Sequence, residues 1–282
     1  MKNILITGSN GQLGHEISQV AKNYPQFNFI FTDVEELDIT NKNEVESLFE
    51  NKNIDCVINC AAFTAVDKAE DSYEKATELN AKAPGILAEV TKNNNAKIVQ
   101  ISTDFVFDGN NNIPYKEDEL PNPASAYGKT KFAGEKEIIN ATKDYIIIRT
   151  AWLYSSHGHN FVKSMRKYAN ERGVLNVVFD QVGTPTYAYD LAEVILKLID
   201  KNARGIFHFT NEGVASWFDF AKAIVDISAI DCEVNPLHTE EFPLPAQRPQ
   251  FSVLDKTKIK KTLSIKIPYW RDSLVECINK LK

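Results

Sequence analysis

Membrane-spanning and secretory segments are lacking in this sequence of 282 residues. No stretch approaches the roughly 18–20 uninterrupted apolar residues that cross a bilayer. Met1-Lys2-Asn3 leads directly into a strand pattern, without the charged and apolar regions of a signal peptide. We therefore expect no membrane partner and predict a cytoplasmic protein.

An excess of positive charge is lacking as well. The formal net charge is -6 and the pI is near 5.5, which argues against a surface for nucleic acid. A local basic pocket for a phosphorylated small molecule is still compatible with this charge. With 43% hydrophobic and 25% charged residues, the composition is ordinary for a globular protein and supplies a large core.

Cysteine is rare and scattered. Cys56, Cys60, Cys232 and Cys277 lack the close paired spacings of a zinc site. The first two fall in an apolar run that is typical of a buried strand, where a thiol serves as a small hydrophobic group. We predict reduced, structural thiols and no metal centre.

The first half of the chain alternates short apolar runs with helical patterns. This is typical of a parallel sheet covered on both faces, and a helix cap is expected near Thr40 or Asn41. The pattern predicts an α/β fold with a doubly wound parallel sheet of the Rossmann type, and a dinucleotide-binding domain over residues 1–149. Predicted strands span 3–7, 28–32, 56–60, 97–102 and 145–149, and predicted helices span 12–24, 42–51, 72–93 and 125–141.

After residue 149 the pattern loosens, and loops, prolines and aromatic residues become more frequent. The prolines from Pro236 to Pro249 predict an irregular but ordered loop. Residues 150–282 are predicted to form a smaller C-terminal substrate domain with segments that cross back to the sheet. Predicted helices span 161–170, 189–199 and 217–225, the last capped by Ser216, and predicted strands span 176–179 and 205–209.

A glycine motif follows the first predicted strand and opens a helix. Gly8, Gly11 and Gly14 allow a tight turn, close approach of the backbone to a pyrophosphate and close helix packing. The helix N-terminus would then face the negative charge. Asp33, at the end of the second strand, can accept hydrogen bonds from an adenosine ribose. No arginine stands beside Asp33 to receive a 2′-phosphate, so we favour NADH and leave NADPH open.

A tyrosine and a lysine lie four residues apart in a predicted helix, so their side chains share one face. The ammonium of Lys131 is expected to lower the pKa of Tyr127 from its usual value of about 10. Thr103, at the end of the fourth strand, reaches the edge where open α/β sheets bind ligands. We predict that Thr103 binds a substrate carbonyl, Tyr127 delivers a proton and Lys131 holds the nicotinamide ribose.

Further cofactor contacts are predicted at other strand ends. Asp38 and Ile39 would flank the adenine, and the small residues after the third strand would let the cofactor pass. The predicted cofactor-binding residues are Gly8, Gly11, Gln12, Leu13, Gly14, Asp33, Asp38, Ile39, Ala61, Ala62, Phe63, Thr64, Tyr127 and Lys131.

Taken together, these motifs resemble the extended short-chain dehydrogenase/reductase superfamily. More closely, the chain resembles the dTDP-4-dehydrorhamnose reductase family over nearly its whole length. The stretches that carry this resemblance are residues 11–14 (GQLG), 64–70 (TAVDKAE), 102–107 (STDFVF), 149–154 (RTAWLY), 180–186 (DQVGTPT) and 248–249 (RP).

The resemblance implies a dTDP-sugar substrate. The reaction would reduce the C4 ketone of dTDP-4-dehydro-6-deoxy-L-mannose to dTDP-L-rhamnose, a sugar donor for polysaccharide. Two residues are candidates for the diphosphate end, where arginine pairs well with phosphate. The implied substrate-binding residues are Val66, Thr103, Asp104 and Trp152 at the sugar, and Gln181 and Arg248 at the nucleotide diphosphate.

The chain departs from the family pattern in two respects. Phe105 stands where tyrosine is common, so we assign it no catalytic role. Some relatives are thought to dimerise through acidic residues that hold a divalent metal. Glu16 fits that set, whereas Tyr189 and Lys280 stand near the other positions. We therefore predict no metal, and a homodimer stays open.

Two other functions fit the same residues. An NAD-dependent nucleotide-sugar epimerase or dehydratase would regenerate its bound NAD in each cycle, so net consumption of NADH separates it from a reductase. A non-catalytic regulatory subunit, similar to the β subunit of methionine adenosyltransferase, would bind dinucleotide while serving a partner enzyme. The complete set of Thr103, Tyr127 and Lys131 argues against that role.

Overall fold

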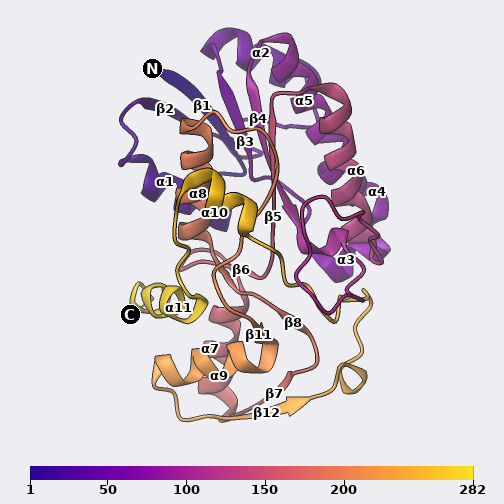
Figure 1. Cartoon of the computed structure of the whole chain (residues 1–282), viewed down its shortest axis with the longest axis vertical. Helices are drawn as coiled ribbons and strands as arrows, with labels where there is room; N and C mark the ends of the chain where they lie inside the picture. Colours follow the sequence, from indigo (N-terminus) through magenta and orange to yellow (C-terminus); the bar gives the residue numbers. More distant parts are fainter. Residues whose placement is uncertain (282) are drawn as a thin grey trace.

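A computed structural model describes residues 1–281 of the chain. Its central sheet has six parallel strands in the order β10-β5-β4-β3-β1-β2 (Figure 1). The predicted doubly wound α/β fold is confirmed. The strands are β1 (Lys2–Thr7), β2 (Phe27–Phe31), β3 (Cys56–Asn59), β4 (Lys97–Thr103), β5 (Tyr145–Thr150) and β10 (Gly205–His208).

Helices cover both faces of this sheet. One face packs on α1 (Gln12–Ala21), α8 (Ala188–Asp200) and α10 (Thr257–Leu263), and the other on α2 (Lys42–Lys52), α5 (Ala83–Asn93) and α6 (Ala126–Ala141). Successive strand side chains alternate between the faces: Ile4 and Ile6 join the first cluster and Leu5 the second, and all three are fully buried. Each strand therefore contributes apolar residues to two cores, as the uninterrupted apolar runs predict.

The order of the strands decides where a ligand can bind. From β1 the chain goes to β2 on one side and then returns to β3 on the other side. The loops that leave β1 and β3 therefore diverge, and they open a crevice at the carboxyl edge of the sheet. Thr7 and Asn59 end these two strands, and the Thr7 hydroxyl donates to Asn59 Oδ1 at 2.7 Å.

A second region lies beyond the carboxyl edge of the sheet (Figure 1). It contains α7 (Phe161–Arg172), α9 (Trp217–Ser228), α11 (Trp270–Asn279) and the parallel pair β7 (Val174–Val178) and β12 (Glu233–Leu237). The same half of the chain also sends α8, β10 and α10 back to the sheet. The division into a dinucleotide-binding domain, residues 1–149, and a substrate domain, residues 150–282, stays a prediction.

Short elements connect these parts. They are α3 (Val66–Asp71), α4 (Tyr73–Thr77), a π-helical turn (Glu78–Lys82), the 3₁₀ turns η2 (Asp104–Val106) and η3 (Thr239–Glu241), and the short strands β6 (Leu153–Tyr154), β8 (Val182–Gly183), β9 (Thr186–Tyr187) and β11 (Ala215–Ser216).

Two expectations about local structure need correction, and two helices were missed. The helical segment predicted from Ser72 begins earlier, at Val66, and is interrupted at Ser72. Pro236 lies within strand β12 and not in an irregular loop; a two-stranded sheet consists of edge strands, which tolerate proline. The helices α10 and α11 were not predicted, because their short apolar patterns follow a loop-like, proline-rich stretch. Among residues 1–281, no helix has the length and apolar character needed to cross a membrane.

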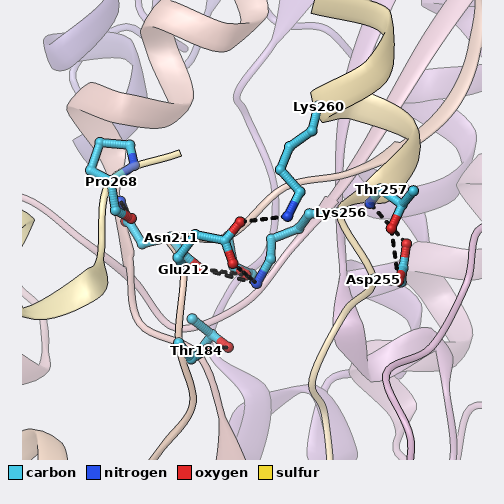
Figure 2. A network of polar contacts seen from close by, with 10 residues as sticks. Thr184, Asn211, Glu212, Asp255, Lys256, Thr257, Lys260 and Pro268 are labelled. Carbon is cyan, nitrogen blue, oxygen red and sulfur yellow. Dashed lines mark hydrogen bonds and ion pairs between the residues drawn. The ribbon is translucent and has the colours of Figure 1, made fainter. Parts of the chain in front are cut away.

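A buried lysine of the C-terminal segment contacts the loop that follows β10 (Figure 2). Lys256 is 7% exposed, and its ammonium donates to the carbonyl of Asn211 at 3.1 Å and lies 3.6 Å from the Glu212 carboxylate. Lys260, one turn later in α10, donates to Glu212 at 2.8 Å. These contacts fix the point at which the chain leaves the sheet for the second region.

Candidate active site

The glycine loop has the shape that a bound pyrophosphate requires. Gly8 adopts φ +64°, and a Cβ atom there would lie 2.7 Å from the backbone nitrogen of Ala61. A Cβ on Gly14 would lie 2.5 Å from Ser9 Cα. The N-cap of α1 is Gly11, and no side chain caps this helix. Its first amide groups therefore remain available to an anion.

Asp33 supports the glycine loop from the end of β2. Its Oδ2 accepts a hydrogen bond from the backbone of Asn10 at 2.9 Å, and its Oδ1 accepts one from Val34 at 2.8 Å. Each carboxylate oxygen retains a lone pair for a ribose hydroxyl. The exposed residues Glu35 and Glu36 follow, so the charge beyond β2 is acidic.

A loop of the second region packs against the start of α1. The Gln12 side chain accepts from Asn160 Nδ2 at 2.9 Å, and His157 Nε2 lies 3.1 Å from the carbonyl oxygen of Asn10. Leu13 is buried in the sheet core. The predicted cofactor residues of this loop are thus brought together, but Leu13 can present only its backbone.

The other predicted cofactor residues occupy neighbouring strand ends. Asp38 accepts from the Thr40 hydroxyl at 2.7 Å, and Ile39 is buried. After β3, Ala61, Ala62 and Phe63 are half-buried and Thr64 is exposed. The last four follow the carboxyl end of β3, and contact of these residues with the cofactor stays a prediction.

One residue that fixes this edge was missed by the sequence reasoning. Asn80 is 1% exposed and lies in the π-helical turn. Its side chain accepts from the backbone nitrogen of Phe63 at 2.9 Å, donates to the Phe63 carbonyl at 3.0 Å and donates to Thr130 at 3.1 Å. It therefore ties the loop after β3 to the helix that carries Tyr127. A polar residue in an apolar helical pattern was the signal that could have found it.

Helix α6, which carries Tyr127 and Lys131, begins against the loop that follows β4. Ser125 caps the helix by accepting from the backbone of Gly128 at 3.2 Å. A Cβ on Gly128 would lie 2.2 Å from the carbonyl oxygen of Phe105. This glycine therefore lets η2 approach α6 closely, which places Asp104 beside Tyr127. The ring of Phe105 lies edge-on to Tyr127, with centroids 5.6 Å apart.

The expected effect of Lys131 on Tyr127 is wrong. Burial raises the pKa of Tyr127 to about 12, and the nearby Thr103 hydroxyl opposes only part of this effect. The Lys131 ammonium instead donates a hydrogen bond to the carbonyl oxygen of Ile101 at 2.6 Å. Burial lowers the pKa of Lys131 to about 8, although Glu135 acts in the opposite direction. At neutral pH the tyrosine is protonated and the lysine is mostly cationic.

Thr103 and Asp104 form a buried polar pair at the end of β4. The Thr103 hydroxyl donates to Asp104 Oδ1 at 2.9 Å and accepts from the backbone of Phe105 at 3.2 Å. Asp104 Oδ2 is buried and has no hydrogen-bond partner in the described part of the chain. Burial raises the pKa of Asp104 to about 6. An unpartnered buried carboxyl oxygen can serve a sugar hydroxyl.

Trp152 occupies a strained position between β5 and β6. Its φ is +48°, which is costly for a residue with a bulky side chain. The indole stacks on Trp217 with ring centroids 3.6 Å apart. A Cβ on Gly183 would lie 2.7 Å from the indole, so only glycine leaves room for this ring. The neighbouring contacts hold a flat aromatic surface at the predicted sugar site.

The predicted diphosphate residues line one cleft of about 350 Å³. The Arg248 guanidinium forms a two-pronged pair with Asp67 of α3, at 2.9 Å and 2.7 Å. This pair holds the pKa of Asp67 below its usual range. Gln181 is 5% exposed and donates to Thr239 at 3.1 Å. Asp67 lies beside Val66, which is half-buried at the start of α3. The cleft is lined by Asp108, Asn110, Gln181, Thr239, Phe242, Pro243, Leu244, Ala246, Gln247, Arg248 and Gln250.

The residues at the metal positions of some relatives do not fit a divalent cation. Glu16 is buried and accepts from the Ser155 hydroxyl at 2.6 Å. The Lys280 ammonium lies 4.3 Å from the centroid of the Tyr189 ring, so a fixed positive charge stands nearby. Within residues 1–281, no group of three or more His, Cys, Asp and Glu side chains could hold a metal ion.

The fold and these residues define a class of protein. A doubly wound sheet joins an uncapped glycine loop to a strand-end threonine and to a tyrosine and lysine on one helix face. This is the arrangement of an extended short-chain dehydrogenase/reductase, a class of oxidoreductases.

Comparisons with known proteins specify the family. The family described as RmlD substrate binding domain matches residues 1–282. The dTDP-4-dehydrorhamnose reductase of Aggregatibacter actinomycetemcomitans is 38% identical, over 97% of each chain. A crystal structure of a dTDP-4-dehydrorhamnose reductase from Clostridium acetobutylicum is 48% identical, with a TM-score of 0.96 and 99% of each chain covered. The enzyme of that name from Bacillus anthracis, solved in complex with NADP, is 37% identical, with a TM-score of 0.96 over 99% of this chain and 100% of that chain. This chain belongs to the dTDP-4-dehydrorhamnose reductase family.

Proposed function

We propose that this protein reduces the C4 ketone of dTDP-4-dehydro-6-deoxy-L-mannose to dTDP-L-rhamnose. The observation that carries the proposal is that the glycine loop, Thr103, Tyr127 and Lys131 meet at one edge of the sheet, beside a cleft that contains Arg248. The names and full-length similarity of the relatives support this choice of substrate. A cytoplasmic location and a homodimer stay predictions.

A bound nicotinamide would supply the hydride, and the protein's residues supply the rest of the chemistry. Tyr127 keeps its proton at neutral pH, because burial raises its pKa to about 12. A forming alkoxide is more basic than this phenol, so the proton passes to the substrate oxygen as negative charge develops. The Thr103 hydroxyl can turn from Asp104 to the same oxygen and stabilise that charge.

Lys131 serves as an orienting cation. It is 4% exposed and held by the Ile101 carbonyl, so its remaining two N–H bonds have a fixed direction. These bonds can hold the hydroxyl groups of the nicotinamide ribose.

The substrate would span from Trp152 to Arg248. Trp152, Val66 and Asp104 offer an aromatic face, an apolar wall and a carboxyl group to the sugar. Arg248 keeps N–H groups beyond the two that bind Asp67, and they can pair with a diphosphate. Gln181 adds an amide in the same cleft.

We also propose that NADH is the preferred cofactor. Asp33, Glu35 and Glu36 place negative charge where the 2′-phosphate of NADPH would lie. The Bacillus anthracis relative binds NADP, so the two cofactors should be compared directly. The ratio of kcat/KM for NADH to that for NADPH should exceed about tenfold and should fall in Asp33→Ala. Equal values for both cofactors would exclude this preference.

The function is tested with dTDP-L-rhamnose and NAD⁺ in the reverse direction, and with the ketosugar and NADH in the forward direction. We expect one NADH consumed for each sugar reduced; a change in the sugar without net consumption would indicate an epimerase or dehydratase. Tyr127→Phe should lower kcat by about 10²- to 10⁴-fold with NADH binding retained. Tyr73→Phe, at a half-exposed helix position, is the matched control. Full turnover in Tyr127→Phe would refute the proposed role.

A further inference from the structure

A buried ion pair lies under the catalytic helix. Glu135 is one helical turn beyond Lys131, as Lys131 is beyond Tyr127, so the three side chains follow one face of α6. Glu135 is fully buried and Arg149 is 2% exposed. Arg149 donates to Glu135 Oε1 at 2.9 Å through Nε and to Oε2 at 2.7 Å through Nη2.

This pair connects α6 to three neighbouring strands. Arg149 lies next to Ser102 of β4 on one side and next to His208 of β10 on the other. The Ser102 hydroxyl donates to Glu135 Oε1 at 2.5 Å. Arg149 Nη1 lies 3.4 Å from His208 Nε2. The network lies at the carboxyl edge of the sheet, and Ser102 is the residue before Thr103.

The histidine in this network is a neutral acceptor. Its Nδ1 lies 3.1 Å from the Tyr115 carbonyl, which can only accept, so Nδ1 carries the hydrogen and Nε2 faces Arg149. Burial and the charge of Arg149 lower the pKa of His208 to about 3. Within residues 1–281, the ion pair of Arg149 is with Glu135 alone.

Stability alone does not explain such a pair. Desolvation of two charges largely cancels their attraction, and well-packed apolar residues often replace a buried pair without loss. However, a carboxylate that accepts three hydrogen bonds fixes the position of its helix and places a negative charge at a defined point. We propose that Glu135 is a positioning residue: held by Arg149 and Ser102, it sets α6 against β4 so that Tyr127 meets Thr103, and it keeps Lys131 cationic.

The groups that face Lys131 support an electrostatic part for Glu135. Glu135 faces Lys131 from α6, the neutral carbonyl of Ile101 faces it from β4, and the thiol of Cys60 faces it from the residue after β3. Burial raises the pKa of Cys60 to about 12, so the thiol is neutral. Glu135 is thus the anion that counteracts the burial of Lys131.

The test rests on the proposed reductase function and uses Glu135→Gln in the full-length protein. We expect kcat to fall about tenfold or more while KM for the sugar stays within about twofold, since no substrate contact is removed. The alkaline limb of the kcat profile should move to lower pH by about one unit. Glu137→Gln, the same change at an exposed position on the same helix, should leave both unchanged.

A second measurement does not depend on activity. In lysine labelled with ¹³C at Cε, the Lys131 signal, identified by its loss in Lys131→Arg, should titrate at lower pH in Glu135→Gln. If that variant does not fold, Glu135→Gln/Arg149→Met removes both buried charges and should show a shift in the same direction but smaller, because loss of the Arg149 cation acts in the opposite sense. An inactive wild-type protein would refute the reductase function but leave the lysine titration decisive. An unshifted Lys131 titration in Glu135→Gln would overturn the role of Glu135. The same holds if the wild-type protein is active and Glu135→Gln has the same pH profile of kcat.

Discussion

The two halves of the site are built in different ways. The cofactor half depends on backbone shape: Gly8 and Gly14 leave no room for a Cβ atom, and α1 begins without a side-chain cap. The substrate half depends on paired side chains: Arg248 is held by Asp67, and Trp152 is stacked on Trp217. We therefore expect added volume to damage the first half and altered charge to damage the second.

The largest effect is expected in the cofactor half. Gly8→Ala combines a positive φ with a contact of 2.7 Å to the backbone of Ala61. Strain on the order of 3 kcal/mol should weaken NADH binding at least about a hundredfold, as measured by fluorescence titration. Gly173→Ala is the control, because Gly173 has φ +67° but no atom within 4 Å. It should cost about 1 kcal/mol of stability and leave NADH binding unchanged. Equal loss of binding in both variants would contradict the steric explanation.

An intermediate effect is expected in the substrate half. Arg248→Gln removes the cation of the cleft, and the KM of the nucleotide sugar should rise about ten- to a hundredfold, with KM for NADH unchanged. Arg204→Gln is a matched control, because Arg204 forms the same two-pronged pair with Asp144, with both contacts at 3.0 Å, outside the cleft. A rise in KM for NADH in Arg248→Gln would show that the two halves are not independent.

The smallest effect concerns the junction of the halves at Asp104. Its folded-state pKa is raised to about 6, above the value near 4 in an unfolded chain. The folded state therefore binds more protons, and the free energy of unfolding falls as pH rises from about 4 to 6. Asp104→Asn should remove this slope and gain on the order of 2 kcal/mol above pH 6, as measured by chemical denaturation.

Asp108→Asn should change the pH dependence of the free energy of unfolding in the opposite direction. The pKa of Asp108 is lowered, first by the hydrogen bond from the backbone of Asn110. Its carboxylate therefore stabilises the fold above the unfolded pKa, and this contribution is lost as pH falls. If both variants shifted the pH profile in the same direction, burial would not be the cause at Asp104.

Local patterns in the sequence were sufficient to predict the sheet and to place Tyr127 and Lys131 on one helix face. The alternation of apolar runs and helices predicts β1 to β5, since each run must bury both faces of a parallel strand. The spacing of Tyr127 and Lys131 predicts a shared helix face, and Ser125 marks its start. The resemblance to the family added the substrate residues, which no periodicity could supply.

Other features depend on distant segments that meet only in the folded chain. Asn80 carries no motif of its own, and the motif that contains Asp67 does not reveal its partner; their roles follow from contacts with Phe63 and Arg248. The pKa of Tyr127 was predicted in the wrong direction, because spacing indicates proximity of Lys131 but not how deeply the phenol is buried.

By itself, the sequence determined the doubly wound sheet, the glycine turn and the shared helix face of Tyr127 and Lys131, because these follow from periodicity, glycine and local spacing. Only the tertiary structure decided which charges face Lys131, where Arg248 is anchored and how far burial raises the pKa of Tyr127. The physical reason is that electrostatic effects and desolvation depend on every atom packed around a group, and most of those atoms are far away along the chain.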